Sequence, residues 1–388
     1  MDFSDARPRL PALTSLRFFA AFHVVIFHFQ AMQTFIGPVW FQKLSSIGYV
    51  GVSFFFVLSG FILVYTYAGR PMVLKNFWRA RFARIYPAYA FSLLVTAPFF
   101  FYAVLTMNFP FFVWAKTHLK LASALVLSLL HAWVPPAALT WNAVAWSLSV
   151  EAFFYVLFPF LLLVLVRRSQ PQLLLIAAVS WLTSLVFSGS DVVLNADRLS
   201  IVNADVLGAF WLNALKFNPL ARLPEFLLGM ACGFLFLRSR RESKLASLLV
   251  LSGIAALLVV VYFSAVIPYP ILHTALLAPA FAAIVYGFAL RPNWGMILEN
   301  RWLVLCGDAS YSLYLLHSMI VGMYFHSTTG QLRYQSPMGI LVFVLIAVSI
   351  SALVYRFIEE PARRKLNPRR EPQLGSIETQ PPLEAAPA

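Results

Sequence analysis

Long apolar runs separated by short polar connections constrain the fold of this chain more than any other feature of its sequence. Of its 388 residues, 61% are hydrophobic and 11% are charged. A water-soluble protein of this length has too little interior to hide so much apolar surface. Ten runs approach or exceed the roughly 18 apolar residues that predict a membrane-spanning helix. The sequence therefore predicts an all-α integral membrane protein with about ten transmembrane helices. The runs lie near 13–34, 48–67, 85–106, 146–166, 172–188, 223–237, 245–266, 271–290, 303–326 and 338–357.

Basic residues fall on alternate connections between these runs, and this pattern predicts the orientation of the chain. The formal net charge is +14, and Lys and Arg in short connections are retained on the cytoplasmic side of a membrane. Ten spans place every strongly basic connection on one side, so both termini are predicted to be cytoplasmic. Topology and contact with anionic lipid then explain the charge, and nucleic acid is not an expected partner. The basic connections carry Arg7, Arg9, Arg70, Lys75, Arg79, Arg81, Arg84, Arg167, Arg168, Arg238, Arg240, Arg241, Lys244, Arg291, Arg301, Arg363, Arg364 and Lys365.

Two segments outside these runs need separate predictions. The stretch 119–133, "LKLASALVLSLLHAW", is short for a span. A crossing there would move Arg167 and Arg168 to the opposite side, so we expect the stretch to lie in the interface or to re-enter. Residues 1–366 form the predicted membrane domain, and residues 367–388, rich in Pro and Glu, are predicted to be a disordered cytoplasmic tail.

Cysteine usage and the N-terminus complete the outline. The two cysteines, Cys232 and Cys306, have no CxxC neighbour, so we expect no disulfide framework and no metal site. Arg7 and Arg9 precede the first apolar run as they would in a signal peptide. Because no convincing cleavage site follows and further spans come after it, we expect this first helix to be retained.

Arg17 and His28 are ionisable residues inside the first apolar run, where hydrocarbon resists them. Such residues mark functional sites by default, because burying them is costly unless a partner or water compensates. They are eleven residues apart, close to three helical turns, which places them on one face about 16 Å apart; His23 lies off this face. The alternative is structural: Arg17 extends to the headgroups and His28 bonds a neighbouring helix.

Further polar residues are predicted at the outer ends of other spans. Ser147 and Ser149 begin the run at 146–166 from the outside, and His317 reaches the middle or outer half of the run at 303–326. A carboxylate beside a histidine orients the ring and raises its basicity. We therefore expect five of these groups to converge on one outward-facing polar cavity. They are His28, Glu151, Arg222, Glu225 and His317.

Three arginines lie in the stretch "FWRARFARIYPAY", just before the predicted third span. Topology alone explains Arg79, Arg81 and Arg84. With the adjacent Trp78 and Tyr86 they also suit an anionic ligand that contains an aromatic ring, because guanidinium groups match phosphate in a bidentate geometry. The residues alone leave both interpretations open.

Taken in order, the motifs resemble those of the acyltransferase family 3 membrane proteins, which move acyl groups, usually acetyl, onto sugars and other hydroxyl acceptors. The resemblance covers residues from about 11 to about 365, and the order and number of the motifs make it specific. It also implies ten spans, in agreement with the charge argument. The motifs are "LTSLRFFAAFHVVIFHF", "GYVGVSFFFVLSGF", "WRARFARIYPAY", "WSLSVEAFFYVLFP", "RLPEFLLG", "SYSLYLLH" and "FIEEP".

The resemblance implies roles for individual residues. His28 matches the catalytic histidine, and Arg17 is the arginine paired with it in the same motif. Glu151 matches the acidic residue of the Trp-Ser-Leu element, and Arg222 with Glu225 matches a further polar motif near the outer face. The arginines at 79, 81 and 84 resemble a basic motif associated with acyl-CoA recognition at the cytoplasmic face.

The chain departs from the family pattern in two respects. Ser53 stands where many relatives carry Asp, which puts any role of an acid at this position in doubt. Many relatives also carry a fused extracytoplasmic esterase-like domain. We expect this protein either to reach its acceptor directly or to pass the acyl group to a separate extracytoplasmic partner.

The expected function is that of a multi-pass membrane O-acyltransferase of a bacterial inner membrane. Acyl-CoA, usually acetyl-CoA, would be a co-substrate rather than a bound cofactor, and the acceptor a hydroxyl of an extracytoplasmic or membrane-associated glycan. His28 would act as a general base or take the acyl group itself, with Glu151 orienting its ring, Arg222 stabilising the oxyanion, and His317 and Ser147 on the acceptor side or structural. The competing interpretation is a proton-coupled transporter or flippase. Acceptor identity and a homodimer stay open.

Overall fold

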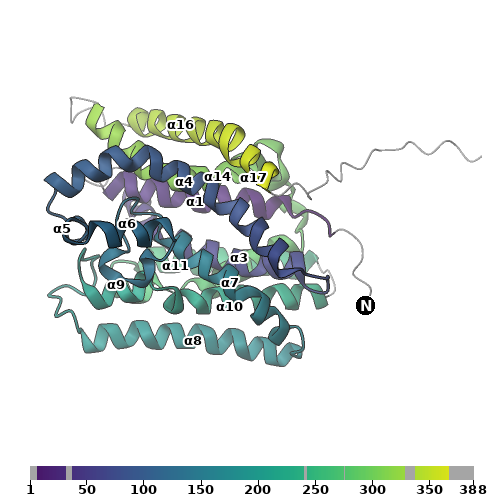
Figure 1. The fold of residues 1–388 in the computed structure, drawn as a ribbon. Helices are drawn as coiled ribbons and strands as arrows, with labels where there is room; N and C mark the ends of the chain where they lie inside the picture. The colour runs from purple at the N-terminus through teal and green to yellow at the C-terminus, as the bar shows by residue number, and fades with distance from the viewer. Residues whose placement is uncertain (1–6, 32–36, 240–242, 275, 328–336, 367–388) are drawn as a thin grey trace, which may run out of the picture.

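The computed structural model describes residues 7–31, 37–239, 243–274, 276–327 and 337–366. Within these segments the chain forms a bundle of helices, and ten spans are long and apolar enough to cross a membrane (Figure 1). The prediction of an all-α membrane protein with ten spans is therefore confirmed. The predicted tail at 367–388 lies outside the described residues, as do Arg240 and Arg241.

The spans include several helices that were not predicted to continue as far as they do. The last span, for example, runs through one turn of π-helix into a short final helix. In chain order the spanning elements are α1 (Pro11–Ala31), η1 (Gly48–Val50) with α3 (Gly51–Tyr67), α4 (Leu74–Thr106), α7 (Trp146–Leu165), α8 (Gln170–Leu194), α9 (Phe210–Phe217) with α10 (Pro219–Arg238), α11 (Ser243–Phe263), α12 (Tyr269–His273) with α13 (Ala278–Ala289), α14 (Arg301–Ser327), and α16 (Pro337–Val354) with η5 (Tyr355–Glu359) and α17 (Glu360–Leu366).

Residues 107–145 form a compact layer of short elements instead of a further span. The longest of them, α6, has 9 residues, which is about 13 Å of helix against a hydrocarbon thickness of about 30 Å. This layer lies at the end of the bundle opposite the N-terminus (Figure 1). The stretch 119–133 therefore does not cross the membrane. The elements of the layer are α5 (Pro110–Thr117), α6 (Leu119–Leu127), η2 (His131–Trp133) and η3 (Pro135–Ala137); α2 (Val39–Ser46) and η4 (Asn293–Glu299) lie in other connections.

Helix α4 begins eleven residues earlier than the apolar pattern predicted. It is continuous over 33 residues from Leu74, in spite of Pro87 and Pro98. The arginines of its first three turns are thus helical residues with fixed directions. The prediction failed here because apolar content sets the expected start of a span, whereas a helix continues through polar turns when their side chains find partners.

Several pairs of helices approach so closely that only glycine fits between them, and the pairs α3–α10 and α1–α14 give the shortest distances. A Cβ atom on Gly229 of α10 would lie 2.0 Å from the carbonyl oxygen of Val57 in α3. A Cβ atom on Gly307 of α14 would lie 2.0 Å from the carbonyl oxygen of Thr14 in α1. Small residues permit this approach, and close packing is a main source of association between helices in lipid. The pairs α3–α10 and α1–α14 are therefore tightly packed, and their glycines are required for this packing.

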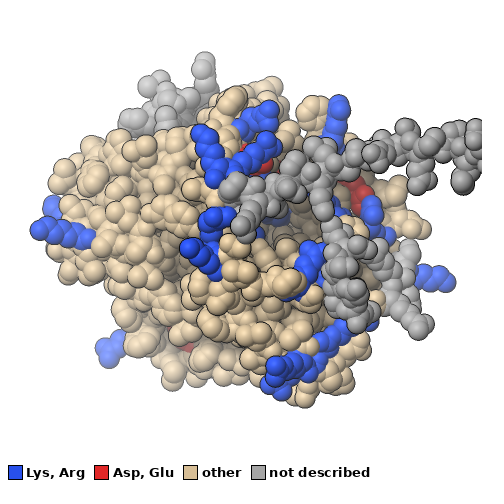
Figure 2. All heavy atoms as spheres, turned by 45° about the vertical axis from the view of Figure 1, so that its right-hand side comes forward, with Lys and Arg blue, Asp and Glu red and all other residues tan. Residues whose placement is uncertain are grey.

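One end of the bundle, here called the basic end, carries Arg7, Arg70, Arg168, Arg238 and Arg301. Arg238 donates to the carbonyl oxygens of Arg168 and Val166 at 2.5 and 3.0 Å, which satisfies the end of α7. Figure 2, which brings the right-hand side of Figure 1 forward, shows Lys and Arg side chains distributed around this end. The described chain begins and finishes here, and the assignment of this end to the cytoplasm stays a prediction.

Candidate functional site

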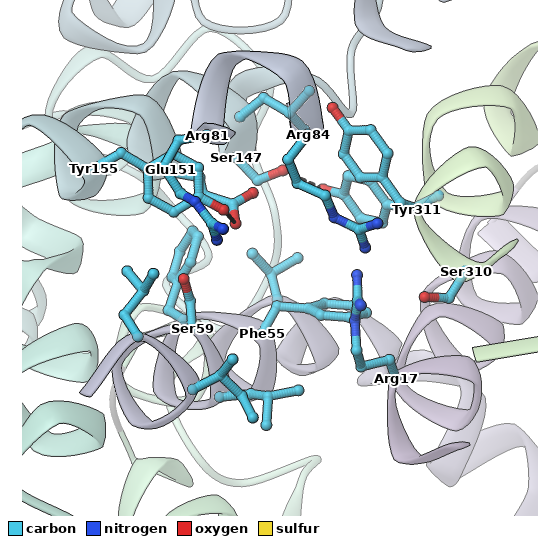
Figure 3. Close-up of a pocket in the computed structure, with 17 residues that line it drawn as sticks. Arg17, Phe55, Ser59, Arg81, Arg84, Ser147, Glu151, Tyr155, Ser310 and Tyr311 are labelled. Atoms are coloured by element: carbon cyan, nitrogen blue, oxygen red, sulfur yellow. Dashed lines mark hydrogen bonds between the residues drawn. The ribbon is translucent and has the colours of Figure 1, made fainter. Parts of the chain in front are cut away.

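A cavity of about 160 Å³ lies inside the bundle between α1, α3, α4, α7 and α14 (Figure 3). Its floor is apolar and comes mainly from α3, including Phe55 and Phe56. Its polar groups come from four other helices and from one serine of α3. These polar residues are Arg17, Ser59, Arg81, Arg84, Ser147, Glu151, Tyr155, Ser310, Tyr311 and Tyr314.

Arg17 and Arg84 point toward each other across this cavity (Figure 3). Arg84 has a counter-ion, because its Nη1 lies 3.0 Å from Oε1 of the buried Glu359. Glu359 in turn accepts a hydrogen bond of 2.8 Å from Ser312. Within the described residues no group hydrogen-bonds to the guanidinium of Arg17. Two cations that face each other away from bulk water repel strongly, so this arrangement suits an anionic ligand held between them.

Arg81 reaches the cavity through an aromatic cluster. Its guanidinium lies 5.6 Å from the ring centre of Tyr155 and 5.7 Å from that of Tyr67. Cation–π contacts of this geometry stabilise a cation by about 0.5 kcal/mol or more. Its Nε has no hydrogen-bond partner in the described structure. Arg79 is exposed and does not line the cavity. Two of the three predicted donor-binding arginines, Arg81 and Arg84, therefore share the cavity with Arg17.

Glu151 belongs to this arginine-lined cavity and not to the surroundings of His28. Its carboxylate accepts a hydrogen bond from the Tyr155 hydroxyl. The prediction that Glu151 orients His28 is wrong, and the reason is the depth at which α7 begins. The first residue of α7, Trp146, is only 6% exposed, because Phe56 of α3, Phe217 of α9 and His273 of α12 pack around its ring. The second turn of α7 therefore lies at the level of the arginines.

His28 is instead in contact with His317, a residue almost 300 positions away. The Nε2 of His317 lies 3.2 Å from the Nδ1 of His28, and the ring centres are 4.8 Å apart. Each Nδ1 also faces a carbonyl oxygen of its own helix. His28 Nδ1 is 2.9 Å from the oxygen of Val24, and His317 Nδ1 is 2.6 Å from that of Tyr314. Of the five polar groups expected to converge, these two histidines are in contact with each other.

The carbonyl contacts define the tautomer of each neutral ring. A carbonyl oxygen only accepts, so both Nδ1 atoms carry hydrogen. The Nε2 of His317 is then an acceptor, and the hydrogen on His28 Nδ1 forms a bifurcated hydrogen bond to it and to the Val24 carbonyl oxygen. The Nε2 of His28 keeps its lone pair, and no hydrogen bond to it occurs in the part of the chain that the structure describes. This atom is therefore available to take a proton or to attack a carbonyl carbon.

Tyr314 lies between the histidine pair and the arginine-lined cavity. It lines the cavity, and its ring centre is 5.8 Å from that of His317 and 6.1 Å from that of Phe55. Its hydroxyl donates to the carbonyl oxygen of Val144 at 2.9 Å and accepts from Ser147 at 2.8 Å. Ser147 thus holds Tyr314 in place. Neither histidine lines the cavity itself.

Arg222 and Glu225 form a separate buried cluster, so the prediction of one cavity with all five outer polar groups is wrong. Arg222 Nε lies 3.0 Å from Glu225 Oε2, and the two side chains are 0% and 1% exposed. Arg222 also donates to Ser53 and to the carbonyl oxygen of His273, each at 3.0 Å. This face of α10 packs against α3, and Arg222 reaches the end of α12. Ser53 here accepts a hydrogen bond from an arginine.

Sequence reasoning did not identify several residues of the site. Glu359 was part of a quoted motif but had no assigned partner, and Tyr155 and Tyr314 read as ordinary apolar residues of their spans. Their signal is weak, because a tyrosine in a span is common at membrane interfaces. The described residues contain no group of three or more His, Cys, Asp or Glu side chains arranged to hold a metal ion.

Comparison with known proteins gives a consistent set of matches. A family model described as an acyltransferase domain, acyltransferase family 3, matches residues 10–356. Acyltransferase MdmB of Streptomyces mycarofaciens is 30% identical in an alignment that covers 93% of this chain and 94% of that protein. O-acetyltransferase OatA of Staphylococcus aureus is 26% identical in an alignment that covers 92% of this chain and 57% of OatA. Peptidoglycan O-acetyltransferase OatA of Listeria monocytogenes is 25% identical in an alignment that covers 92% of this chain and 56% of that protein. The chain thus spans a little over half the length of the two OatA proteins. No solved structure matches it.

Proposed function

The chain belongs to acyltransferase family 3, and from this membership we propose that it transfers an acetyl group from acetyl-CoA to a hydroxyl of a carbohydrate, with His28 as the reacting histidine. The observation that carries this proposal is the guanidinium of Arg17, which has no hydrogen-bond partner among the described residues and faces Arg84 across the cavity. An acyl-CoA supplies the anion that this arrangement requires. We further place the enzyme in a bacterial plasma membrane, since MdmB and OatA are bacterial proteins.

The donor enters from the basic end, which is the cytoplasmic side by the positive-inside rule. Its diphosphate lies between Arg17 and Arg84, where guanidinium groups make bidentate hydrogen bonds to phosphate oxygens. Arg81 and the exposed Arg79 contact the remaining phosphate. The thin pantetheine arm extends past Tyr314 and brings the thioester toward His28.

The free Nε2 of His28 supports either of two routes. In direct transfer it takes the proton of the acceptor hydroxyl while the oxygen attacks the thioester carbon, the C–S bond breaks, and the proton passes to the departing CoA sulfur. In two-step transfer Nε2 attacks the thioester carbon first, and the C–S bond breaks as CoA leaves as the thiolate. The acceptor oxygen then attacks the acyl carbon, the C–Nε2 bond breaks to restore neutral His28, and the hydroxyl proton passes to the CoA thiolate. Both routes need the tautomer that the Val24 carbonyl selects.

The acceptor is proposed to be a glycan because one relative is named a peptidoglycan O-acetyltransferase. A soluble peptidoglycan fragment is therefore the first acceptor to test, followed by exopolysaccharide repeats, lipopolysaccharide sugars and macrolide-like molecules. Transfer proceeds either directly to the acceptor or through a separate extracytoplasmic protein.

The test uses the purified protein in nanodiscs with radiolabelled acetyl-CoA, first alone and then with the acceptor panel. We expect the His28→Ala variant to bind CoA normally but to release no CoA and label no acceptor. His23→Ala is the matched control, because His23 lies in the same helix and its Nε2 contacts the carbonyl oxygen of Leu44 at 2.7 Å. Unchanged turnover by His28→Ala would overturn the assignment. Absence of both CoA binding and turnover in the wild type would favour a transporter.

A further inference from the structure

The second histidine, His317, accepts from His28 Nδ1, a position where many catalytic histidines have a carboxylate partner. Its Nδ1 donates to the Tyr314 carbonyl oxygen at 2.6 Å, which leaves Nε2 as an acceptor 3.2 Å from His28 Nδ1. A ring bonded in this way holds its partner in one tautomer and one orientation. With Glu151 bound in the arginine-lined cavity, no carboxylate contacts His28 among the described residues.

Burial decides which of the two rings carries charge. His317 is 0% exposed, whereas His28 is partly exposed. Moving a positive charge from the more accessible ring to the fully buried one costs desolvation energy. No charged group near His317 compensates this cost, because its other neighbours are neutral: the carbonyl and ring of Tyr314, and Ser318, which contacts Asn142. His317 therefore stays neutral, and any proton taken up remains on His28.

We propose that His317 is a positioning residue of the transfer reaction: its neutral Nε2 accepts from His28 Nδ1 and thereby aims the lone pair of His28 Nε2 at the reacting atoms. The inference rests on the proposed role of His28. In the direct route the proton of the hydroxyl moves to His28 Nε2 as the new C–O bond forms, and then to the CoA sulfur as the C–S bond breaks. The Nδ1 hydrogen stays on His28, and His317 gains no proton at any step.

The segment before α7 makes hydrogen bonds that fix the turn of α14 on which His317 lies. The Asn142 side-chain amide donates to the carbonyl oxygen of Leu315 at 3.0 Å, and the Ser318 hydroxyl lies 3.4 Å from Asn142 Oδ1. Ser147 and the Val144 carbonyl fix the hydroxyl of Tyr314, whose backbone oxygen binds His317. The turn of α14 that carries His317 is thus bonded on both sides of the histidine, as a positioning group requires.

The test compares two variants of nearly equal size. Glutamine at 317 keeps an acceptor near the position of Nε2, whereas leucine removes it. We expect His317→Leu to lower kcat by about 10- to 100-fold, the usual effect of removing a second-layer partner, with KM for acetyl-CoA unchanged because the arginines are untouched. We expect His317→Gln to recover most of this loss. Equal kcat losses in both variants, or a wild-type kcat in His317→Leu, would overturn the proposal.

A measurement on the unmodified protein gives a second result that does not depend on the kcat of any variant. Nitrogen-15 NMR of histidine-labelled protein distinguishes the tautomers, and the signals of His28 and His317 are assigned by their loss in His28→Ala and His317→Gln. We expect hydrogen on Nδ1 of both rings, and hydrogen on Nε2 of His28 would contradict the proposal. If His28→Ala is inactive while His317→Leu is normal, only the positioning role fails. If His28→Ala is active, the proposed function fails with it.

Discussion

Replacing Arg17 by glutamine separates a ligand-binding arginine from a structural one. Arg17 makes no hydrogen bond within the described residues and faces the like charge of Arg84 (Figure 3). Removing its charge therefore relieves repulsion, and we expect the unfolding temperature of Arg17→Gln without ligand to equal or exceed that of the wild type. The same change removes one charged partner of the donor. A hydrogen bond to a charged group contributes about 1.5–3 kcal/mol, so CoA affinity should fall by about 10- to 150-fold.

Arg222→Gln is the matched control for this experiment, since it removes the same side chain from the separate cluster. Arg222 is 0% exposed and is paired with Glu225 at 3.0 Å. Breaking a buried ion pair from one side costs about 3–5 kcal/mol because the remaining charge stays uncompensated. We expect a clear loss of thermal stability and little change in the CoA affinity of the folded fraction.

Both variants are measured in nanodiscs, by thermal unfolding without ligand and by titration with non-reactive CoA. The two arginines should give opposite patterns: stability retained and affinity lost for Arg17, stability lost and affinity retained for Arg222. If Arg17→Gln unfolds at a lower temperature and binds CoA as the wild type does, Arg17 is structural and the assignment of the cavity to the donor is refuted.

Two further predictions concern the fold. Gly229→Val should prevent α3 and α10 from packing, because a Cβ would lie 2.0 Å from the Val57 carbonyl oxygen. Gly189→Ala is the control and should have no such effect, because a Cβ at Gly189 meets nothing within 4 Å. Size-exclusion profiles in detergent compare the two variants, and a monodisperse Gly229→Val protein would contradict the packing. Burial lowers the pKa of His131, which lies outside the spans, to about 4. Between about pH 6.5 and 4 the unfolded chain therefore binds more protons than the folded one, and the free energy of unfolding decreases as the pH is lowered, by about 3 kcal/mol in total. His131→Phe should flatten this acid loss in unfolding midpoints, and an unchanged slope would show that other groups cause it.

Hydropathy was sufficient to predict the spans because the preference of a residue for hydrocarbon does not depend on which helix is its neighbour. The distribution of positive charge excluded a crossing at 119–133, because Arg167 and Arg168 had to stay on the basic side. It failed at the start of α4, where Tyr67 and Tyr155 stabilise the Arg81 charge. Those partners belong to other helices, so no local pattern reveals them.

The site was predictable in its members and not in its grouping. Periodicity correctly placed Arg17 and His28 on one face of α1, yet the eleven residues between them leave the arginine at the cavity and the histidine beyond it, next to His317. Arg84 and Glu359 meet across 275 positions. Such pairings depend on which helices are neighbours, and a single sequence carries no direct signal of that order.

The contact between the rings of Phe55 and Tyr314, which both line the cavity, has a consequence for the membrane itself. An enzyme that takes its donor from one side of a bilayer and its acceptor from the other risks becoming a pore, and an open water path would dissipate the ion gradients of the cell. Tyr314, fixed by Ser147 and Val144, packs edge-to-face with Phe55 where the cavity approaches the histidines. If the donor and the acceptor enter from opposite sides, as we propose, this contact would act as a hydrophobic seal between the two compartments and keep the thioester dry until the acceptor arrives.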